Sequence, residues 1–167
     1  MKKFIILSAI PGSGKSTWAK KYAQENPNTK IVSSDGLREE FGGRVNNFEH
    51  EKEVWETFLK RIHEYGKEED VTVIADATMI SNAYRKYYYE NTPEFDRHIL
   101  VFFDLPFEVC CFQNKLRHHS AVVPDYAMKR MHEQFEKPSE EVMSLYDEVI
   151  TVTSKFVSPE YSKKQGN

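Results

Sequence analysis

The feature that most constrains this chain is a glycine-rich segment that joins an apolar run to an amphipathic one. Residues 9–16 read AIPGSGKS, with the apolar residues 4–8 before them and a predicted helix over residues 15–24 after them. The spacing of glycine, lysine and serine is that of a phosphate-binding loop, and the strand–loop–helix setting gives the match a physical meaning. Ala9 stands where the strict pattern has glycine, and a small residue is compatible with a turn there. The segment therefore predicts a site for a polyphosphate.

Each part of this loop has an expected role in holding a nucleoside triphosphate. Gly12 and Gly14 let the backbone curl so that successive N–H groups point inward, and the start of the next helix adds partial positive charge. Lys15 is expected to reach the terminal phosphates, and Ser16 to offer its hydroxyl to Mg²⁺. ATP and Mg²⁺ are therefore the expected donor and metal. The expected donor-binding residues are Pro11, Gly12, Ser13, Gly14, Lys15, Ser16 and Thr17.

A magnesium site of this kind needs a carboxylate, and two strand ends supply candidates. The apolar residues 71–75 are followed by Asp76, and residues 98–103 by Asp104. Ligands of open α/β sheets bind at the carboxyl ends of strands, so either aspartate suits the position. We favour Asp76 as the second metal ligand, because the Leu-Pro pair after Asp104 is typical of a turn before a helix. For both residues the alternative is a capping role in a turn.

Apolar runs alternate with amphipathic stretches along the chain, as is typical of parallel strands covered by helices on both faces. The expected fold class is therefore α/β. Strands are expected over residues 4–8, 30–33, 71–75, 98–103 and 148–153. Helices are expected over residues 15–24, 48–65, 82–90, 107–116 and 124–136. Irregular loops, of the kind that form lids, are expected at residues 41–47 and 118–123. We expect a single domain over residues 1–154 and a flexible tail over residues 155–167.

The composition sets limits on the partners of the chain. No apolar run approaches the roughly 18 residues that a membrane helix needs, so we expect no membrane partner. The two cysteines, Cys110 and Cys111, are adjacent and poorly placed for a structural disulfide, which favours a packing role and a cytoplasmic location. A net charge of −3 argues against nonspecific coating of nucleic acid, although a local basic cleft is compatible with that average.

A second polar cluster follows the strand predicted at residues 30–33. If a helix starts at Ser34, Asp35 and Arg38 lie on one face of it, three residues apart. In phosphoryl transfer a carboxylate can orient a hydroxyl and accept its proton, and an arginine can bind a neighbouring phosphate through two hydrogen bonds. Asp35 is therefore a candidate general base. The alternative is a helix cap, which stabilises by about 1 kcal/mol, and the spacing does not separate the two roles.

Three segments taken together resemble a known family. They read PGSGKSTWA at residues 11–19, SDGLR at residues 34–38 and DAT at residues 76–78. Their order and spacing are similar to those of the phage-type polynucleotide 5′-hydroxyl kinases and related bacterial P-loop kinases, with an ATP-binding domain of the AAA type. Shorter similar segments continue as far as Met131, so the resemblance covers nearly the whole chain.

The resemblance implies a P-loop kinase-like fold with a helical lid, and it implies roles for individual residues. By this resemblance Lys15 acts on the donor phosphates, Asp35 activates the acceptor 5′-hydroxyl, and Arg38 holds the phosphate next to that hydroxyl. Asp76, the expected metal ligand, and Thr78 would also bind the acceptor.

Basic residues of the lid would complete the site. Lys129 and Arg130 are both candidates for the catalytic lid residue, and Arg117 is a second candidate that would contact the donor. Arg85 is a further acceptor-site candidate, with a solvated surface charge as its alternative. The chain departs from the family at Met79, where many relatives carry asparagine, and this leaves the acceptor open.

Three functions are compatible with these residues. The leading one is an ATP-dependent phosphotransferase that moves the γ-phosphate to a hydroxyl, above all the 5′-hydroxyl end of a polynucleotide. The expected partners are then a nucleoside triphosphate and a nucleic-acid 5′ end or a small phosphorylated acceptor. The alternatives are a small-molecule or nucleoside kinase, favoured by Met79 and the acidic net charge, and a noncatalytic ATP-binding module in which Asp35 only caps a helix.

Overall fold

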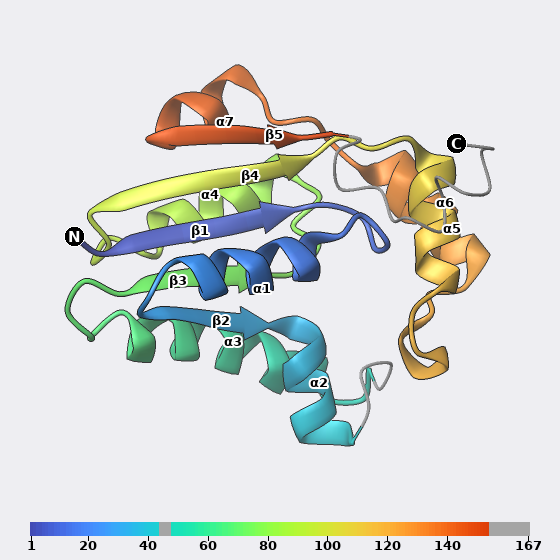
Figure 1. Cartoon of the computed structure of the whole chain (residues 1–167), viewed down its shortest axis with the longest axis horizontal. Helices are drawn as coiled ribbons and strands as arrows, with labels where there is room; N and C mark the ends of the chain where they lie inside the picture. The colour runs from blue at the N-terminus through green and yellow to red at the C-terminus, as the bar shows by residue number, and fades with distance from the viewer. Residues whose placement is uncertain (44–47, 154–167) are drawn as a thin grey trace.

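The computed structural model describes residues 1–43 and 48–153, and at its centre lies a sheet of five parallel strands (Figure 1). The strands are β1 (Lys3–Ser8), β2 (Thr29–Ser33), β3 (Thr72–Asp76), β4 (Arg97–Phe103) and β5 (Glu148–Val152). Their order across the sheet is β2-β3-β1-β4-β5, and each neighbouring pair is parallel. The carboxyl ends of all five strands therefore meet at one edge.

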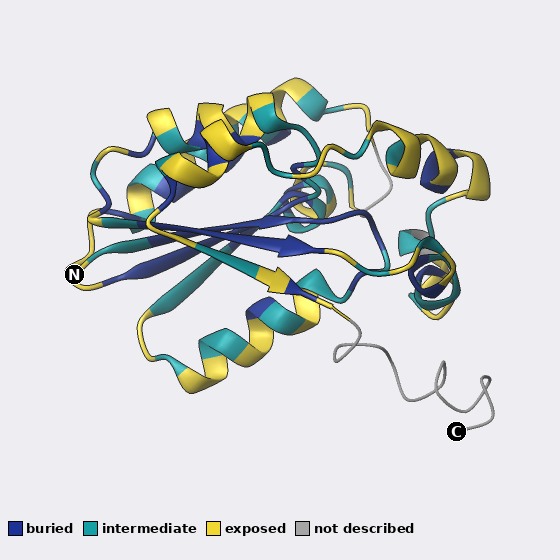
Figure 2. Cartoon of the chain, turned by 90° about the horizontal axis from the view of Figure 1, so that it is seen from above, coloured by how far each residue is buried: buried dark blue, intermediate teal, exposed yellow. Residues whose placement is uncertain are grey.

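Helices cover both faces of the sheet and its carboxyl edge (Figures 1 and 2). They are α1 (Lys15–Glu25), α2 (Ser34–Gly42), α3 (Glu51–Tyr65), α4 (Asn82–Glu90), α5 (Phe107–Lys115), α6 (Asp125–Gln134) and α7 (Glu140–Leu145), with a 3₁₀ turn η1 (His119–Ala121). α1 packs on one face, and α3, α4 and α7 pack on the other. α5 and α6 pack together beyond the strand ends. This is the α/β arrangement that the sequence predicts.

The central strand β1 supplies side chains to both halves of the core. Phe4 and Ile6 pack with α3 and α4, whereas Ile5 and Leu7 pack with α1, and all four are at most 1% exposed. Successive strand residues point to opposite faces, so a strand covered on both faces has to be apolar throughout. Figure 2 shows the buried strands between the two helical layers. This burial explains why the strands are readable from the sequence.

Some elements differ from the prediction. α7 and η1 were not expected, and α7 has only six residues, too few to show a helical period. α3 begins at Glu51 instead of residue 48. α2 continues through Gly42 into the loop expected at residues 41–47, of which residues 44–47 lie outside the described part of the chain. The tail expected at residues 155–167 also lies outside it.

The structure bears on the expectations about membrane helices and about the two cysteines. Within residues 1–43 and 48–153, no helix combines the length and apolar character that crossing a bilayer requires. Cys110 is buried and Cys111 is partly buried, and both are free thiols. The packing role expected for Cys110 is therefore confirmed.

Candidate active site

The phosphate loop connects β1 to α1 through two left-handed glycines. Gly12 has a φ of 82° and Gly14 a φ of 90°, a region that glycine enters without steric cost. Ala9 does not have a positive φ, so the backbone at this position does not require glycine. Its N–H donates to the carbonyl oxygen of Thr78 at 2.8 Å. The departure from the strict motif at Ala9 therefore leaves the loop geometry intact.

Gly12 also fixes the loop against α5. A Cβ atom at Gly12 would lie only 2.1 Å from the carbonyl oxygen of Cys110, so a side chain is excluded. The amide Nε2 of Gln113 donates to the carbonyl oxygen of Gly12 at 2.6 Å. α5 therefore holds the curl of the loop in place, and Gly12 is needed for close packing as well as for its φ.

The polar groups of the loop fit a bound polyphosphate. α1 begins without a side-chain cap, so the N–H groups of its first turn are available to a ligand. The hydroxyl of Ser13 is buried and has no hydrogen-bond partner in the described part of the chain. A buried hydroxyl without a partner is costly, and a phosphate oxygen would supply one. Lys15 is the first residue of α1 and follows directly after this loop.

The two residues expected to bind Mg²⁺ are brought into contact. β3 lies beside β1, and Asp76 is the last residue of β3 and 6% exposed. The hydroxyl of Ser16 donates to Oδ2 of Asp76 at 2.8 Å. Mg²⁺ is commonly held by one or two protein oxygens together with substrate phosphates and water, so this pair is sufficient for it. The alternative carboxylate, Asp104, is exposed at the end of β4.

Asp35 lies between two arginines at the carboxyl edge of the sheet, where α2 follows β2. Its Oδ1 accepts from Nη1 of Arg38 at 2.9 Å, and its Oδ2 accepts from Nη2 of Arg117 at 3.1 Å. The cap of α2 is Ser33, whose hydroxyl oxygen accepts from the N–H of Gly36 at 3.1 Å. The capping role that the sequence left open for Asp35 is thus filled by another residue, and its carboxylate faces guanidinium groups.

Arg38 is held by a residue that the sequence did not identify. Nε and Nη2 of Arg38 donate to the two carboxylate oxygens of Glu51 at 3.0 and 2.9 Å. Burial by itself lowers the pKa of Arg38, but Glu51 and Asp35 together raise it above its ordinary value, so the guanidinium stays charged. A glutamate in the first turn of a helix usually complements the helix dipole, and the sequence carries no signal of this pairing.

Arg85 does not face the acceptor as expected. Its side chain is fully buried, and its guanidinium donates to the hydroxyl of Ser8 at 2.9 and 3.0 Å, to Asn82 Oδ1 at 2.8 Å and to the carbonyl oxygen of Glu136 at 2.6 Å. Burial lowers its pKa to about 10. We correct the assignment of Arg85 to the acceptor site, because these internal bonds tie α4 to β1 and leave no surface for a substrate.

The loop after β3 supports the phosphate loop through its backbone. The carbonyl oxygen of Thr78 accepts from Ala9, and that of Met79 accepts from the hydroxyl of Ser8 at 2.7 Å. Met79 has a φ of 43°, which is rare for a non-glycine residue, and it is 3% exposed within the core. The Met79 side chain therefore packs in the interior.

The three lid candidates occupy different positions. Arg117, two residues beyond α5, reaches Asp35. Lys129 and Arg130 are exposed on α6. Because neighbouring helical residues point about 100° apart, these two side chains leave α6 in different directions.

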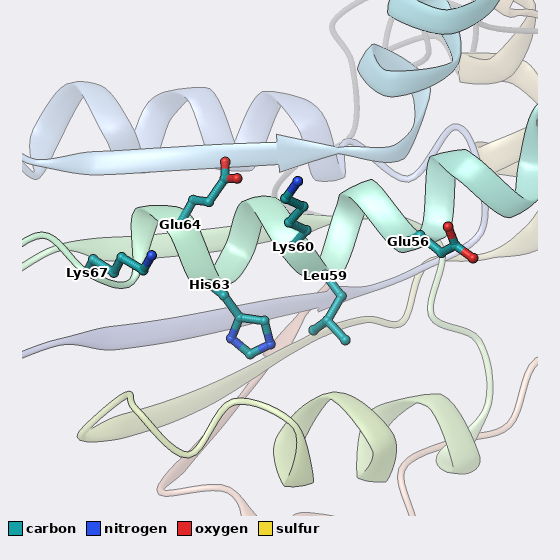
Figure 3. Close-up of a pocket in the computed structure, with 6 residues that line it drawn as sticks. All are labelled: Glu56, Leu59, Lys60, His63, Glu64 and Lys67. Atoms are coloured by element: carbon teal, nitrogen blue, oxygen red, sulfur yellow. The ribbon is translucent and has the colours of Figure 1, made fainter.

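A surface hollow of about 400 Å³ lies elsewhere, along α3 (Figure 3). It is lined by Glu56, Leu59, Lys60, His63, Glu64 and Lys67. Figure 3 shows His63 and Leu59 on one side of α3 and Lys60 and Glu64 on the other. Charges of alternating sign three or four residues apart are typical of a solvated helix surface, and none of the expected site residues lines this hollow.

A phosphate loop at the carboxyl edge of a parallel sheet is the arrangement of the P-loop proteins, a class that binds nucleotides. A family model described as an AAA domain matches residues 5–138. The chain therefore belongs to this AAA-domain family of P-loop, kinase-like proteins, which bind nucleotides.

Comparisons with individual proteins show the same fold with different substrates. L-seryl-tRNA(Sec) kinase from Methanococcus maripaludis is 27% identical over 162 residues, which cover 91% of this chain and 60% of that relative. A gluconokinase from Sinorhizobium meliloti 1021 has a TM-score of 0.62 and 18% identity, covering 96% of this chain and 86% of that one. A chain of the Pnkp1/Rnl/Hen1 RNA repair complex has a TM-score of 0.66 and 22% identity, covering 80% and 43%. This chain spans about 60% of its curated relative.

Proposed function

We propose that the protein is an ATP- and Mg²⁺-dependent kinase that transfers the γ-phosphate to the 5′-hydroxyl end of a polynucleotide. The observation that supports this most is the position of Asp35 between Arg38 and Arg117, at 2.9 and 3.1 Å. A carboxylate flanked by guanidinium groups suits an acceptor in which a hydroxyl stands next to a phosphate. The 5′ end of a polynucleotide presents both groups.

On the donor side, the N–H groups of the loop and Lys15 would bind the β- and γ-phosphates. Ser16 and Asp76, which are 2.8 Å apart, would hold Mg²⁺, with Asp76 acting through a bound water. When bound, Mg²⁺ neutralises charge on the phosphate oxygens. The packing of Gly12 against α5 would hold the backbone of the loop in place before ATP arrives.

On the acceptor side, the hydroxyl oxygen attacks the γ-phosphorus, the bond from this phosphorus to the bridging oxygen breaks, and ADP leaves. Asp35 orients the hydroxyl and accepts its proton. Arg38 binds the phosphate next to the hydroxyl, in the orientation that Glu51 imposes. Arg117, together with Lys129 or Arg130, would stabilise the charge on the transferred group.

A second candidate is a kinase that phosphorylates the hydroxyl of an amino acid attached to a tRNA. The name of the curated relative designates a seryl-tRNA as its substrate. Such a substrate also places a hydroxyl near a polyanion. A small-molecule kinase and a noncatalytic ATP-binding module are the remaining alternatives, and one set of assays separates all of them.

The experiment compares initial rates with labelled ATP and four acceptors: a 5′-hydroxyl oligonucleotide, a nucleoside 3′-monophosphate, a bare nucleoside and a seryl-tRNA. We expect the oligonucleotide and the 3′-monophosphate to exceed the nucleoside, and Arg38→Ala to erase most of that difference with little change in ATP affinity. Because the contact is charge-assisted, rising salt should weaken the preference. Arg61→Ala, which removes an arginine paired with the exposed Glu40, is the control.

Three outcomes would contradict the proposal. Equal wild-type rates with the oligonucleotide, the 3′-monophosphate and the nucleoside would show that the protein does not bind a phosphate of the acceptor. Phosphorylation of seryl-tRNA or of an unrelated metabolite, with none of the oligonucleotide, would assign the site to that acceptor instead. ATP binding without transfer to any acceptor would support the noncatalytic module.

A further inference from the structure

Phe48 is a large apolar side chain that lies exposed beside the acceptor residues. It precedes α3, and 62% of its surface is accessible. Its ring lies over the guanidinium of Arg38, with 4.9 Å between Cζ and the ring centroid. Single exposed apolar residues are common on protein surfaces, so exposure alone indicates nothing. The contact is informative because it places an accessible aromatic ring beside the group proposed to bind the acceptor phosphate.

Arg38 is held from several directions, so its guanidinium has a defined position beside the ring of Phe48. Glu51 accepts two of its N–H groups and Asp35 a third. A second ring, that of Trp55, lies 5.7 Å from Cζ. The Arg38 side chain is only 12% exposed. A guanidinium has five N–H donors, so two of them have no partner among residues 1–43 and 48–153 and are left for a phosphate.

We propose that Phe48 is the stacking platform for the base of the acceptor's terminal nucleotide. The inference rests on the proposed function, since it requires a nucleotide acceptor. The base and the 3′-phosphate of a nucleotide are attached to one ribose, so a phosphate on Arg38 brings the base close to the neighbouring ring. Stacking on an aromatic side chain tolerates every base. The platform therefore adds affinity for a base without selecting a sequence.

Phe41 provides a matched control for this assignment. It is also an exposed phenylalanine near the start of α3, with 42% of its surface accessible. Its ring lies at the end of α2, and its ring neighbour is His50, at 6.3 Å between centroids. Replacing Phe41 therefore removes a comparable exposed ring while the contact between Phe48 and Arg38 remains.

The test uses two 5′-hydroxyl oligonucleotides that differ only in their first nucleotide, which is normal in one and abasic in the other. Both keep the hydroxyl and the adjacent phosphate. In the wild type we expect the abasic acceptor to have a KM roughly 5- to 100-fold higher, the range given by stacking one base. Phe48→Ala should raise the KM of the normal acceptor to that of the abasic one and leave the abasic KM and kcat unchanged. Phe48→Tyr and Phe41→Ala should keep the difference.

Three results would overturn the inference. If Phe48→Ala slows both acceptors equally, the ring only positions Arg38. If the wild type does not distinguish the two acceptors, no base is bound. If neither oligonucleotide is phosphorylated by a protein that binds ATP, the proposed function itself has failed, and the stacking site fails with it. Circular dichroism of Phe48→Ala checks that the fold is retained, as its exposure leads us to expect.

Discussion

Asp35 is bound by two guanidinium groups before any substrate arrives. One carboxylate oxygen accepts from Arg38 and the other from Arg117. In the proposed reaction Arg117 would turn to the transferred phosphate and free one oxygen of Asp35 for the acceptor hydroxyl. Arg38 would keep its bond to Asp35 and bind the acceptor phosphate through its other N–H groups. Because Ser33 caps α2, the charge of Asp35 can be removed without loss of that cap.

Asp35→Asn is expected to keep ATP affinity and to slow phosphoryl transfer by about 100-fold or more, because the amide retains the shape but cannot accept a proton. ATP binding by calorimetry and single-turnover rates measure the two effects separately. Asp104→Asn, at the exposed end of β4, should leave both unchanged. Wild-type transfer by a folded Asp35→Asn protein would show that the base lies elsewhere.

Glu51 is expected to act on the acceptor through Arg38. Glu51→Gln removes the charge of a partly buried, two-bond pair and should raise the KM for an oligonucleotide roughly 5- to 30-fold, equivalent to about 1–2 kcal/mol. Its kcat and the ATP affinity should change little. Glu40→Gln is the control, since Glu40 makes a similar pair with Arg61 in a more exposed position. An equal effect of both substitutions would exclude a specific role for Glu51.

At the scale of residues, the sequence predicted groups that depend on local spacing. The loop residues and the one-turn separation of Asp35 and Arg38 can be read directly. Glu51 was missed and Arg85 was assigned wrongly, because their roles depend on partners far along the chain. Glu51 pairs with Arg38, 13 residues away, and Arg85 bonds Ser8, 77 residues away. A charged residue on a helix looks the same in sequence whether it is exposed or buried.

At the scale of elements, long apolar strands and amphipathic helices were predictable because their periods extend over several turns or residues. α7 has six residues and shows too little of a period, although Ser139 caps it in an ordinary way. The packing of the phosphate loop against α5 was not predictable. It joins Gly12 to Cys110, and the motif alone gives no reason for that contact.

This packing leads to a prediction about two left-handed glycines. Gly12 and Gly43 have similar φ values, 82° and 79°, but a Cβ at Gly12 would lie 2.1 Å from the Cys110 carbonyl oxygen, whereas no described atom lies within 4 Å of one at Gly43. Gly43→Ala should therefore lower the free energy of unfolding only by the penalty for a left-handed alanine, about 1–2 kcal/mol. Gly12→Ala should lower the free energy of unfolding by about 1–3 kcal/mol more, because the added methyl group overpacks the contact with α5.

Thermal or urea unfolding of the two variants measures these costs, and ATP titration shows whether the loop is still formed. Gly12→Ala should also weaken ATP binding, because α5 and the loop have to move apart. Gly43→Ala should bind ATP as the wild type does. Equal stability losses in the two variants would mean that the loop relaxes away from α5 without strain.

At the scale of the whole molecule, the strand order brings the expected site residues together. β3 lies between β2 and β1, so Asp35 after β2, Asp76 at the end of β3 and the loop after β1 share one edge of the sheet. The sequence predicted parallel strands but not their order, since each strand reads as a similar apolar run. The positions of Arg117 after α5 and of Lys129 and Arg130 on α6 depend on the same tertiary packing.

Ionisable side chains buried in the core also make the stability of the folded protein depend on pH in the alkaline range. Burial, with a smaller effect of Cys111, raises the pKa of the Cys110 thiol from 9.0 to about 12. Burial likewise raises the pKa of Tyr88 and of Tyr146. Above pH 9 the unfolded chain loses protons that the folded chain keeps. The unfolded state then binds fewer protons, so the free energy of unfolding falls as pH rises.

Cys110→Ala isolates one part of this dependence. The thiol should account for a loss of about 1 kcal/mol between pH 8 and pH 10, so the stability difference between the wild type and Cys110→Ala should shrink by that amount over the interval. The lowered pKa of Arg85, about 10, acts in the opposite direction, but only between pH 10 and its ordinary value of 12.5. Cys111→Ala should show a smaller change, because Cys111 is less buried. Urea unfolding at pH 8, 9 and 10 measures these differences, and a constant difference for Cys110→Ala would mean that this thiol ionises within the folded protein.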